Sequence, residues 1–253
     1  MEEQKLIQAL HTAEKLKDTM RHCYTSGGRR ESVGEHSWRT ALMAYWIADE
    51  FPEADMNKVI KMCLIHDLGE CFTGDIPTFD KTKADEEREK QLLYAWLETL
   101  PSPYCTEMWA LFEEMTQRET VEAKIFKALD NMEAVIQHNE SDIATWSDNE
   151  YELNLTYGGD KVTFSEYLSR LREALRDETL QKIRDAAAGN LLSGGEGAHY
   201  RAAFATKNGV APESSDYRGN NDKYSASWGK SGADNRALGT ENLLYSRSRG
   251  KSD

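Results

Sequence analysis

The chain has 253 residues, a formal net charge of −13 and no long apolar run. This length allows one large domain or two small ones. A strongly acidic protein is a poor non-specific partner for nucleic acid or an anionic membrane, and a membrane helix needs roughly 18 consecutive apolar residues. Composition and charge therefore argue against a membrane-spanning protein and a general nucleic-acid binder. Small ligands are the better prediction.

The composition changes after residue 186. Residues 187–253 hold ten of the 17 glycines, with nine basic and seven acidic residues, whereas residues 1–186 hold 22 basic and 37 acidic ones. No apolar period survives in the last segment, so it cannot bury enough surface to offset its ordering entropy. We predict a folded domain over residues 1–186 and a disordered tail over residues 187–253.

The four cysteines stand far apart in the sequence, without a CxxC pair. The first residues, MEEQKLIQAL, lack the basic and then apolar layout of a signal peptide. These two features predict reduced thiols and a cytoplasmic protein.

Apolar residues recur at helical spacing nearly everywhere before the tail. A first helix is predicted over residues 4–20. Its apolar stripe consists of Leu6, Leu10, Ala13 and Leu16. The segment YTSGGRRES is predicted to be a loop, because Gly27 and Gly28 interrupt regular structure.

The second predicted helix, EHSWRTALMAYWIADEF, has Ser32 or Gly34 as its cap and ends at Pro52. The third, DMNKVIKMCLIHDLGE, is opened by Asp55. It is apolar almost all round, so we predict a buried central helix. Further helices are predicted over residues 83–100, 102–115, 120–140 and 164–183, with an irregular crossing and one short helix near 140–162. No repeat and no convincing strand is found, so the predicted fold is an all-α, single-domain bundle of six to eight helices.

Polar residues interrupt these apolar helices at three places. His66 and Asp67 end the most apolar helix, His36 opens the second, and Asp130 stands in KIFKALDNMEAVI where a core helix normally has an aliphatic residue. Burying an unpaired carboxylate costs on the order of several kcal/mol, and a divalent cation removes that cost. Two histidines and two aspartates with one or two free positions would make an open metal site. Taken singly, each residue could instead be hydrogen-bonded or paired within the fold.

Three segments, EHSWRTALMA, CLIHDLGECFTGDIP and KALDNMEAVI, resemble the H…HD…D signature of the HD-domain metal-dependent phosphohydrolases. The continuation HDLGECFTGD is similar to the 5'-nucleotidase branch of that superfamily, and the resemblance spans about residues 10–185. It implies that His36, His66, Asp67 and Asp130 hold the divalent ion.

The resemblance also implies roles for three further residues. Glu70 would act as general acid or base, Asp75 would orient water or the sugar, and Arg21 would bind the substrate phosphate. Deoxyribonucleotidase members of the branch follow that arginine with a tryptophan that crowds the 2' position of the sugar. Here His22 stands in its place, which departs from the deoxy-selective pattern.

Many HD enzymes hold two metals and take additional histidines from the stretch between the HD pair and the last aspartate. Residues 68–129 contain no histidine, so the resemblance favours one metal ion over two. That ion could be Mn, Co, Zn, Mg or Fe. Arg29, Arg30 and Arg39 are further candidates for phosphate binding, although arginines in loops are commonly just solvated. The aromatic residues of the second helix, Trp38, Tyr45 and Trp46, could stack on a base, but aromatic residues at helical spacing are more often core.

The leading hypothesis is a metal-dependent phosphohydrolase acting on nucleoside or deoxynucleoside 5'-monophosphates. One alternative is hydrolysis of another phosphate ester or of a nucleotide di- or triphosphate. Another is a non-catalytic HD module that binds metal or nucleotide. The family resemblance also implies a homodimer.

Overall fold

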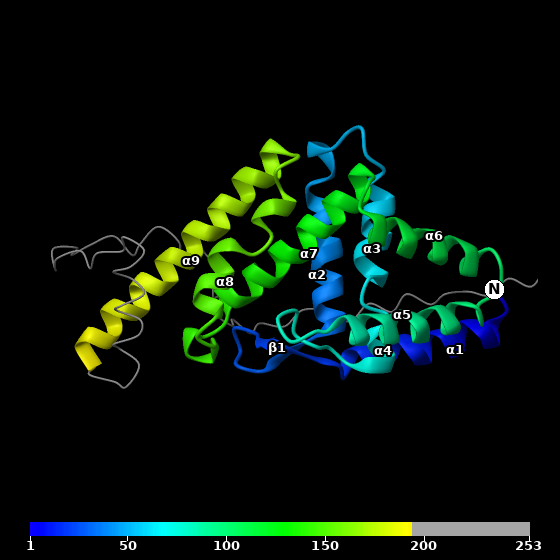
Figure 1. Ribbon diagram of the computed structural model, residues 1–253, viewed down its shortest axis with the longest axis horizontal. Helices are drawn as coiled ribbons and strands as arrows, with labels where there is room; N and C mark the ends of the chain where they lie inside the picture. The colour runs from blue at the N-terminus through cyan, green and yellow to red at the C-terminus, as the bar shows by residue number, and fades with distance from the viewer. Residues whose placement is uncertain (194–253) are drawn as a thin grey trace, which may run out of the picture. The chain divides into compact units, whose positions relative to one another are not determined.

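Helices make up most of the described chain (Figure 1). The computed structural model describes residues 1–193. The helices longer than one turn are α1 (Glu3–Ala13), α2 (Val33–Trp46), α3 (Met56–Ile65), α5 (Lys83–Leu97), α6 (Tyr104–Gln117), α7 (Val121–Glu140), α8 (Glu150–Thr156) and α9 (Glu166–Ser193). A single-turn helix, α4 (Glu70–Thr73), follows α3. The predicted all-α bundle is confirmed.

Side chains cap the helices that carry the site. Ser32 opens α2 in a capping box, because its hydroxyl accepts from the Glu35 backbone N–H while the Glu35 carboxylate accepts from that of Ser32. Asp55 caps α3, and Thr120 caps α7 by accepting from the N–H of Ala123. The predicted caps Ser32 and Asp55 are confirmed, and they fix where each helix begins.

The core lies where α2, α3 and α7 pack on one another (Figure 1). Val59 and Met62 of α3 are fully buried in this core, as are Leu129 and Met132 of α7. The prediction of a buried central third helix is only partly right, because Leu64 on the opposite side of α3 is 49% exposed. Helix α3 therefore has one buried face and one face at the surface.

A short β-hairpin follows α1, where no strand was predicted. Strand β1 (Met20–Tyr24) pairs antiparallel with β2 (Arg30–Ser32), and Gly28 makes the turn with a φ of +81°. Strands this short carry too little alternation for a period-2 pattern to show. Helix α7 supports the hairpin from outside, since Gln137 donates to the Tyr24 carbonyl at 2.6 Å.

The apolar stripe predicted for the first helix is not a buried face. Leu6 and Leu10 are 47% and 58% exposed, whereas Leu16 is buried in a 3-10 turn after α1 has ended at Ala13. The change of helix type rotates Leu16 away from the stripe that an uninterrupted α-helix would give. Only the end of this segment joins the core.

The last helix, α9, continues to Ser193, beyond the boundary predicted at residue 186. The extension begins with three alanines at 186–188, the strongest helix formers. The rest of the predicted disordered tail, from residue 194, lies outside the described residues.

All four cysteines are free thiols, as predicted. Within residues 1–193, no helix combines the length and the apolar character that crossing a bilayer requires.

Candidate functional site

The residues predicted as metal ligands come together from three helices. Helix α3 ends at Ile65, earlier than predicted, and the turn before α4 presents His66 and Asp67. The Nε2 atom of His36, from α2, lies 3.2 Å from Nε2 of His66 and 3.1 Å from Oδ1 of Asp130, from α7. Nε2 of His66 lies 3.1 Å from Oδ2 of Asp67. The structure thus gathers all four around one point.

The hydrogen bonds of the two histidines determine which ring atoms face that point. Nδ1 of His66 lies 2.8 Å from the Cys63 carbonyl, which can only accept, so this nitrogen carries the proton. Nδ1 of His36 contacts the Glu133 carboxylate and likewise donates to it. In neutral rings, both Nε2 atoms therefore present lone pairs to each other and to the carboxylates of Asp67 and Asp130.

Convergence of nitrogen lone pairs and carboxylate oxygens requires a positive charge between them. Burial alone would lower the pKa of His66, yet Asp67 and Asp130 raise it well above 6.5. The two carboxylates therefore favour a positive charge at this position. Tetrahedral coordination at 2.0–2.2 Å would separate neighbouring ligand atoms by about 3.4 Å. Four of the separations in the structure, 3.1–3.5 Å, are close to this value, and the fifth, from Nε2 of His36 to Oδ2 of Asp67, is 3.8 Å. The residues present therefore fit a divalent ion bound by mixed nitrogen and oxygen ligands.

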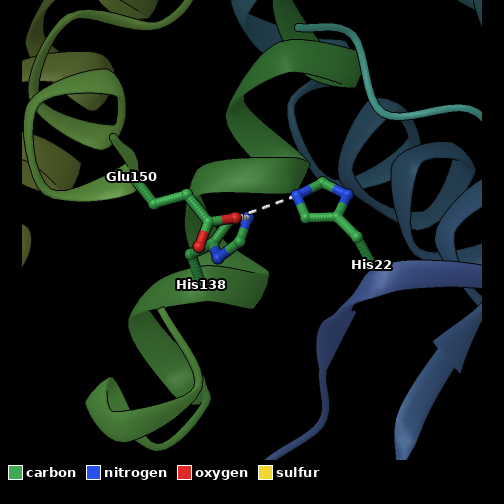
Figure 2. A group of neighbouring side chains, drawn as sticks. All are labelled: His22, His138 and Glu150. Atoms are coloured by element: carbon green, nitrogen blue, oxygen red, sulfur yellow. Dashed lines mark ion pairs between the residues drawn. The ribbon is translucent and has the colours of Figure 1, made fainter. Parts of the chain in front are cut away.

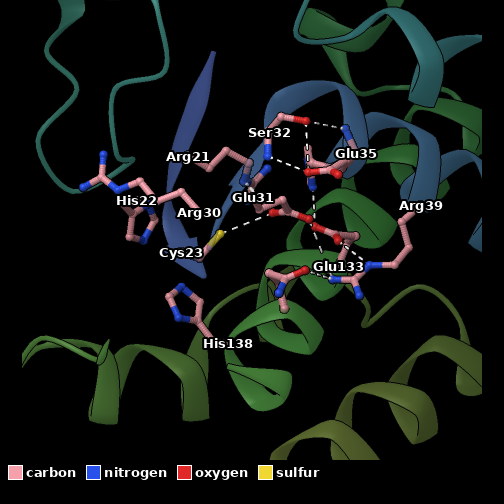
Figure 3. A network of polar contacts seen from close by, with 12 residues as sticks. Arg21, His22, Cys23, Arg30, Glu31, Ser32, Glu35, Arg39, Glu133 and His138 are labelled. Atoms are coloured by element: carbon pink, nitrogen blue, oxygen red, sulfur yellow. Dashed lines mark hydrogen bonds and ion pairs between the residues drawn. The ribbon is translucent and has the colours of Figure 1, made fainter. Parts of the chain in front are cut away.

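Glu133 and Arg39 belong to a polar network (Figure 3), and Glu133 also contacts Nδ1 of His36. The Glu133 carboxylate is fully buried, and burial would raise its pKa, but His36, Arg21 and Arg39 lower it to about 2. Arg39 donates through Nε to Glu133 at 2.6 Å. It also donates to Glu140. An ionised carboxylate behind a metal-binding imidazole fixes its orientation and makes it a stronger ligand.

Sequence reasoning missed Glu133, although a signal was present. It lies three residues after Asp130, on the same side of α7, between Met132 and Val135, which are both fully buried. Arg39, considered above for phosphate binding, is occupied in this network instead. Arg29 is likewise occupied, because its guanidinium binds the Glu35 carboxylate at 2.5–2.8 Å.

Glu70 begins α4, directly after the turn that presents Asp67. Its side chain is buried, and Oε2 has no hydrogen-bond partner within the described protein. Burial, followed by the negative charges of Asp67, Asp75 and Glu89, raises the Glu70 pKa to about 10. Glu70 is therefore a protonated acid at neutral pH, able to donate a hydrogen bond or a proton.

Asp75 follows Gly74, whose φ of +78° favours glycine and turns the chain after α4. Burial raises the pKa of Asp75, and the positive charge of Arg21 opposes this shift. Asp75 lines the same cavity as the metal-binding candidates. Its position is compatible with orienting a bound molecule, the role that the resemblance implies.

Arg21 reaches this cavity from β1. Its side chain is 12% exposed, and Nε lies 3.2 Å from the Glu31 carboxylate. Burial would lower the Arg21 pKa, but Glu133, Cys23 and Glu31 raise it well above 12.5. Arg21 is thus a permanent cation at the edge of a site that is otherwise rich in acidic groups.

One cavity of about 140 Å³ unites these groups. Its lining includes Arg21, His36, Asp67, Glu70, Asp75 and Asp130, together with His22, Phe79, Lys81, Lys127, His138 and Tyr157.

The aromatic residues of α2 do not contribute to this cavity. Trp38, Tyr45 and Trp46 are instead 60–67% exposed, so they belong neither to the core nor to the cavity.

Comparison with known proteins agrees with this geometry. The HD domain family matches residues 13–172, more than half of the chain. The chain belongs to the HD domain family. Human and bovine proteins named 5'-deoxynucleotidase HDDC2 are each 32% identical to it over 139 residues, which cover 53% of this chain and 67% of theirs. The resemblance inferred from the sequence motifs is confirmed.

One solved structure supports the same assignment, and a more distant one shows the same fold. A predicted metal-dependent phosphohydrolase from Magnetospirillum magnetotacticum MS-1 is 28% identical, with a TM-score of 0.60 over 70% of this chain and 95% of that chain. An HD-domain phosphohydrolase from Listeria innocua is 19% identical, with a TM-score of 0.51 over 80% of this chain, and shares the fold. His36, His66 and Asp67 give this HD domain a group able to bind a metal.

Proposed function

We propose that this HD protein is a metal-dependent phosphohydrolase that removes phosphate from nucleoside or deoxynucleoside 5'-monophosphates. His36, His66, Asp67 and Asp130 would hold one divalent ion. The observation that carries the proposal is the convergence of four acceptor groups beside a protonated Glu70, with Arg21 lining the same cavity. The name 5'-deoxynucleotidase, given to relatives with 32% identity, supports a nucleotide substrate.

Each residue of the cavity is assigned a separate role in phosphate hydrolysis. The divalent ion that His36, His66, Asp67 and Asp130 would hold would supply Lewis-acid activation of the phosphate and of water at neutral pH. Arg21 binds the phosphate, because its guanidinium fork matches phosphate oxygens. Asp75 orients the water or the sugar from the loop after α4.

Glu70 is proposed to act as the acid rather than the base. Its carboxyl is buried and protonated, so it can give its proton to the nucleoside oxygen as the phosphorus–oxygen bond breaks. A cation beside Asp67 would offset one of the charges that raise the Glu70 pKa. Burial, the largest cause, would remain. Glu70 can therefore stay protonated in the metal-bound enzyme.

The test is phosphate release by metal-stripped protein reloaded in turn with Mn, Co, Zn, Mg or Fe(II). Ribo- and deoxyribonucleoside 5'-monophosphates are the substrates, and nucleoside triphosphates are the comparison. Release should require metal, vanish in Asp67→Ala and persist in the control Asp80→Ala, which changes an exposed aspartate outside the ligand set. Release from triphosphates alone would favour the alternative substrate class. Absence of release with every metal would leave the non-catalytic module.

We also propose that two copies of the chain associate through the surface of α2 and α3. Trp38 and Leu64 line one surface hollow, and Tyr45 and Trp46 add exposed aromatic area further along α2. Contiguous apolar surface of this kind commonly marks a protein interface. Sedimentation should give a dimer for the wild type and a monomer for Trp38→Glu. A monomeric wild type would refute this proposal without affecting the catalytic one.

A further inference from the structure

A second group of potential ligands lies beside the catalytic cavity (Figure 2). It joins His22 of β1, His138 near the end of α7 and Glu150 at the start of α8. Both histidines line the cavity, but neither belongs to the metal site described above. The three converge from separate elements, and one ligand atom of each lies within 4.8 Å of the other two.

The geometry of this group resembles that of the first site. Oε1 of Glu150 lies 3.0 Å from Nε2 of His22 and 3.6 Å from Nε2 of His138. These separations bracket the value of about 3.4 Å expected between ligands of a tetrahedral ion. The longer one exceeds hydrogen-bond distance, so a direct hydrogen bond does not account for the approach of His138 to this oxygen.

The charge balance of the group also favours a cation. The Glu150 side chain is only 4% exposed, and its other oxygen accepts from the Ser147 N–H at 2.6 Å. Burial would raise the Glu150 pKa, but contact with His22, His138 and Ser147 lowers it to about 2. Burial lowers the pKa of His138 to about 4, which leaves that ring neutral. Within residues 1–193, the ion pairs of Glu150 are with these two imidazoles, neither of which is a permanent cation.

We propose that His22, His138 and Glu150 form a second divalent-ion site, suited to a borderline ion such as Zn²⁺, with its fourth position open to the catalytic cavity. Two imidazoles and one carboxylate are a ligand set that zinc accepts when a further position is left for water or substrate. The ion would supply the positive charge that the buried carboxylate lacks. It would also bridge His138 to the oxygen that it approaches without hydrogen bonding.

This site is independent of the proposed phosphohydrolase activity. The one-ion expectation was drawn from the absence of histidine between residues 68 and 129, and His22 and His138 both lie outside that stretch. An ion bound here would adjoin the same cavity, because His22 and His138 line it together with Asp67 and Asp130. Its presence is measured by metal content and needs no assay of turnover.

The test measures Zn²⁺ bound to the full chain by equilibrium dialysis after chelator treatment, with elemental analysis of the protein. His22→Gln is the primary variant, because this side chain is 30% exposed and its loss disturbs packing least. Glu150→Gln, which keeps the shape of the buried side chain, is the second. His11→Gln changes an exposed histidine of α1 and is the matched control.

His22→Gln and Glu150→Gln should each bind one equivalent of Zn²⁺ fewer than the wild type. The control, His11→Gln, should bind the same amount as the wild type. The loss should recur in the Asp67→Ala background, where the first site is disabled, so failure of that site cannot imitate it. Circular dichroism establishes that each variant is folded. Equal Zn²⁺ content in the wild type and the folded variants would overturn the second site.

Discussion

Replacing Glu133 by Gln tests whether the buried network tunes the metal site. The substitution keeps the shape of the side chain and an acceptor oxygen for Nδ1 of His36, but it removes the negative charge behind the ring. Loss of such a partner costs roughly 10–100-fold in metal affinity, or about 1.4–2.7 kcal/mol. Because the acceptor oxygen survives, and Arg39 keeps Gln137 and Glu140 as partners, we expect the lower end, about tenfold.

The assay is competition for Zn²⁺ between the metal-stripped protein and a chromogenic chelator. Glu140→Gln is the matched control, because Glu140 also binds Arg39 from α7 but is half-exposed and does not touch His36. The control should retain wild-type affinity. Saturating metal should restore the kcat of Glu133→Gln, because the catalytic groups themselves are unchanged. Equal metal affinity in the two variants would refute the role assigned to Glu133.

Three further predictions follow from the cavity and the backbone. Glu70→Gln should lower kcat by roughly 10²–10⁴-fold at unchanged metal content. It should also remove the loss of activity as pH rises through the pKa of this acid, and a persisting alkaline limb in the pH–rate profile would exclude Glu70 as its source. Arg21→Gln should raise KM for a monophosphate by about 10–100-fold, since a charged hydrogen bond contributes roughly 1.5–3 kcal/mol; an unchanged KM would remove Arg21 from phosphate binding. Gly158→Ala should destabilise the fold more than Gly28→Ala in urea unfolding. Both have positive φ, costing about 1–2 kcal/mol, but only at Gly158 would the new Cβ lie 2.8 Å from Cβ of Asn131; equal losses would mean that Asn131 moves freely.

The sequence was sufficient to predict the helices that build the site. Long apolar periods and the caps at Ser32 and Asp55 placed α2 and α3, and misplaced polar residues pointed to His36 and Asp130. Pattern reasoning succeeds here because a polar group inside an apolar helix is costly and must have a reason. The role of each residue as a metal ligand remains a prediction until metal binding is measured.

Pairing between distant segments could not be predicted in the same way. The β-hairpin depends on support from α7 through Gln137, and the Glu150 cluster depends on a contact between α8 and the hairpin. These contacts are set by tertiary packing, which local propensity does not contain. His22 stood out in the sequence only through the family resemblance, and His138 not at all, although the fold brings both to one carboxylate.

Helix α7 positions several side chains of the candidate site at once. Lys127, Asp130, Glu133 and Gln137 follow one another at intervals of three or four residues, so they form a polar stripe along one side of the helix. Lys127 pairs with Asp130 at 2.6 Å, while Asp130 and Glu133 both contact His36. Gln137 then links the same stripe to β1, the strand that carries Arg21. Because the stripe contacts both His36 and the hairpin, a shift of α7 would displace the proposed metal ligands and the hairpin together.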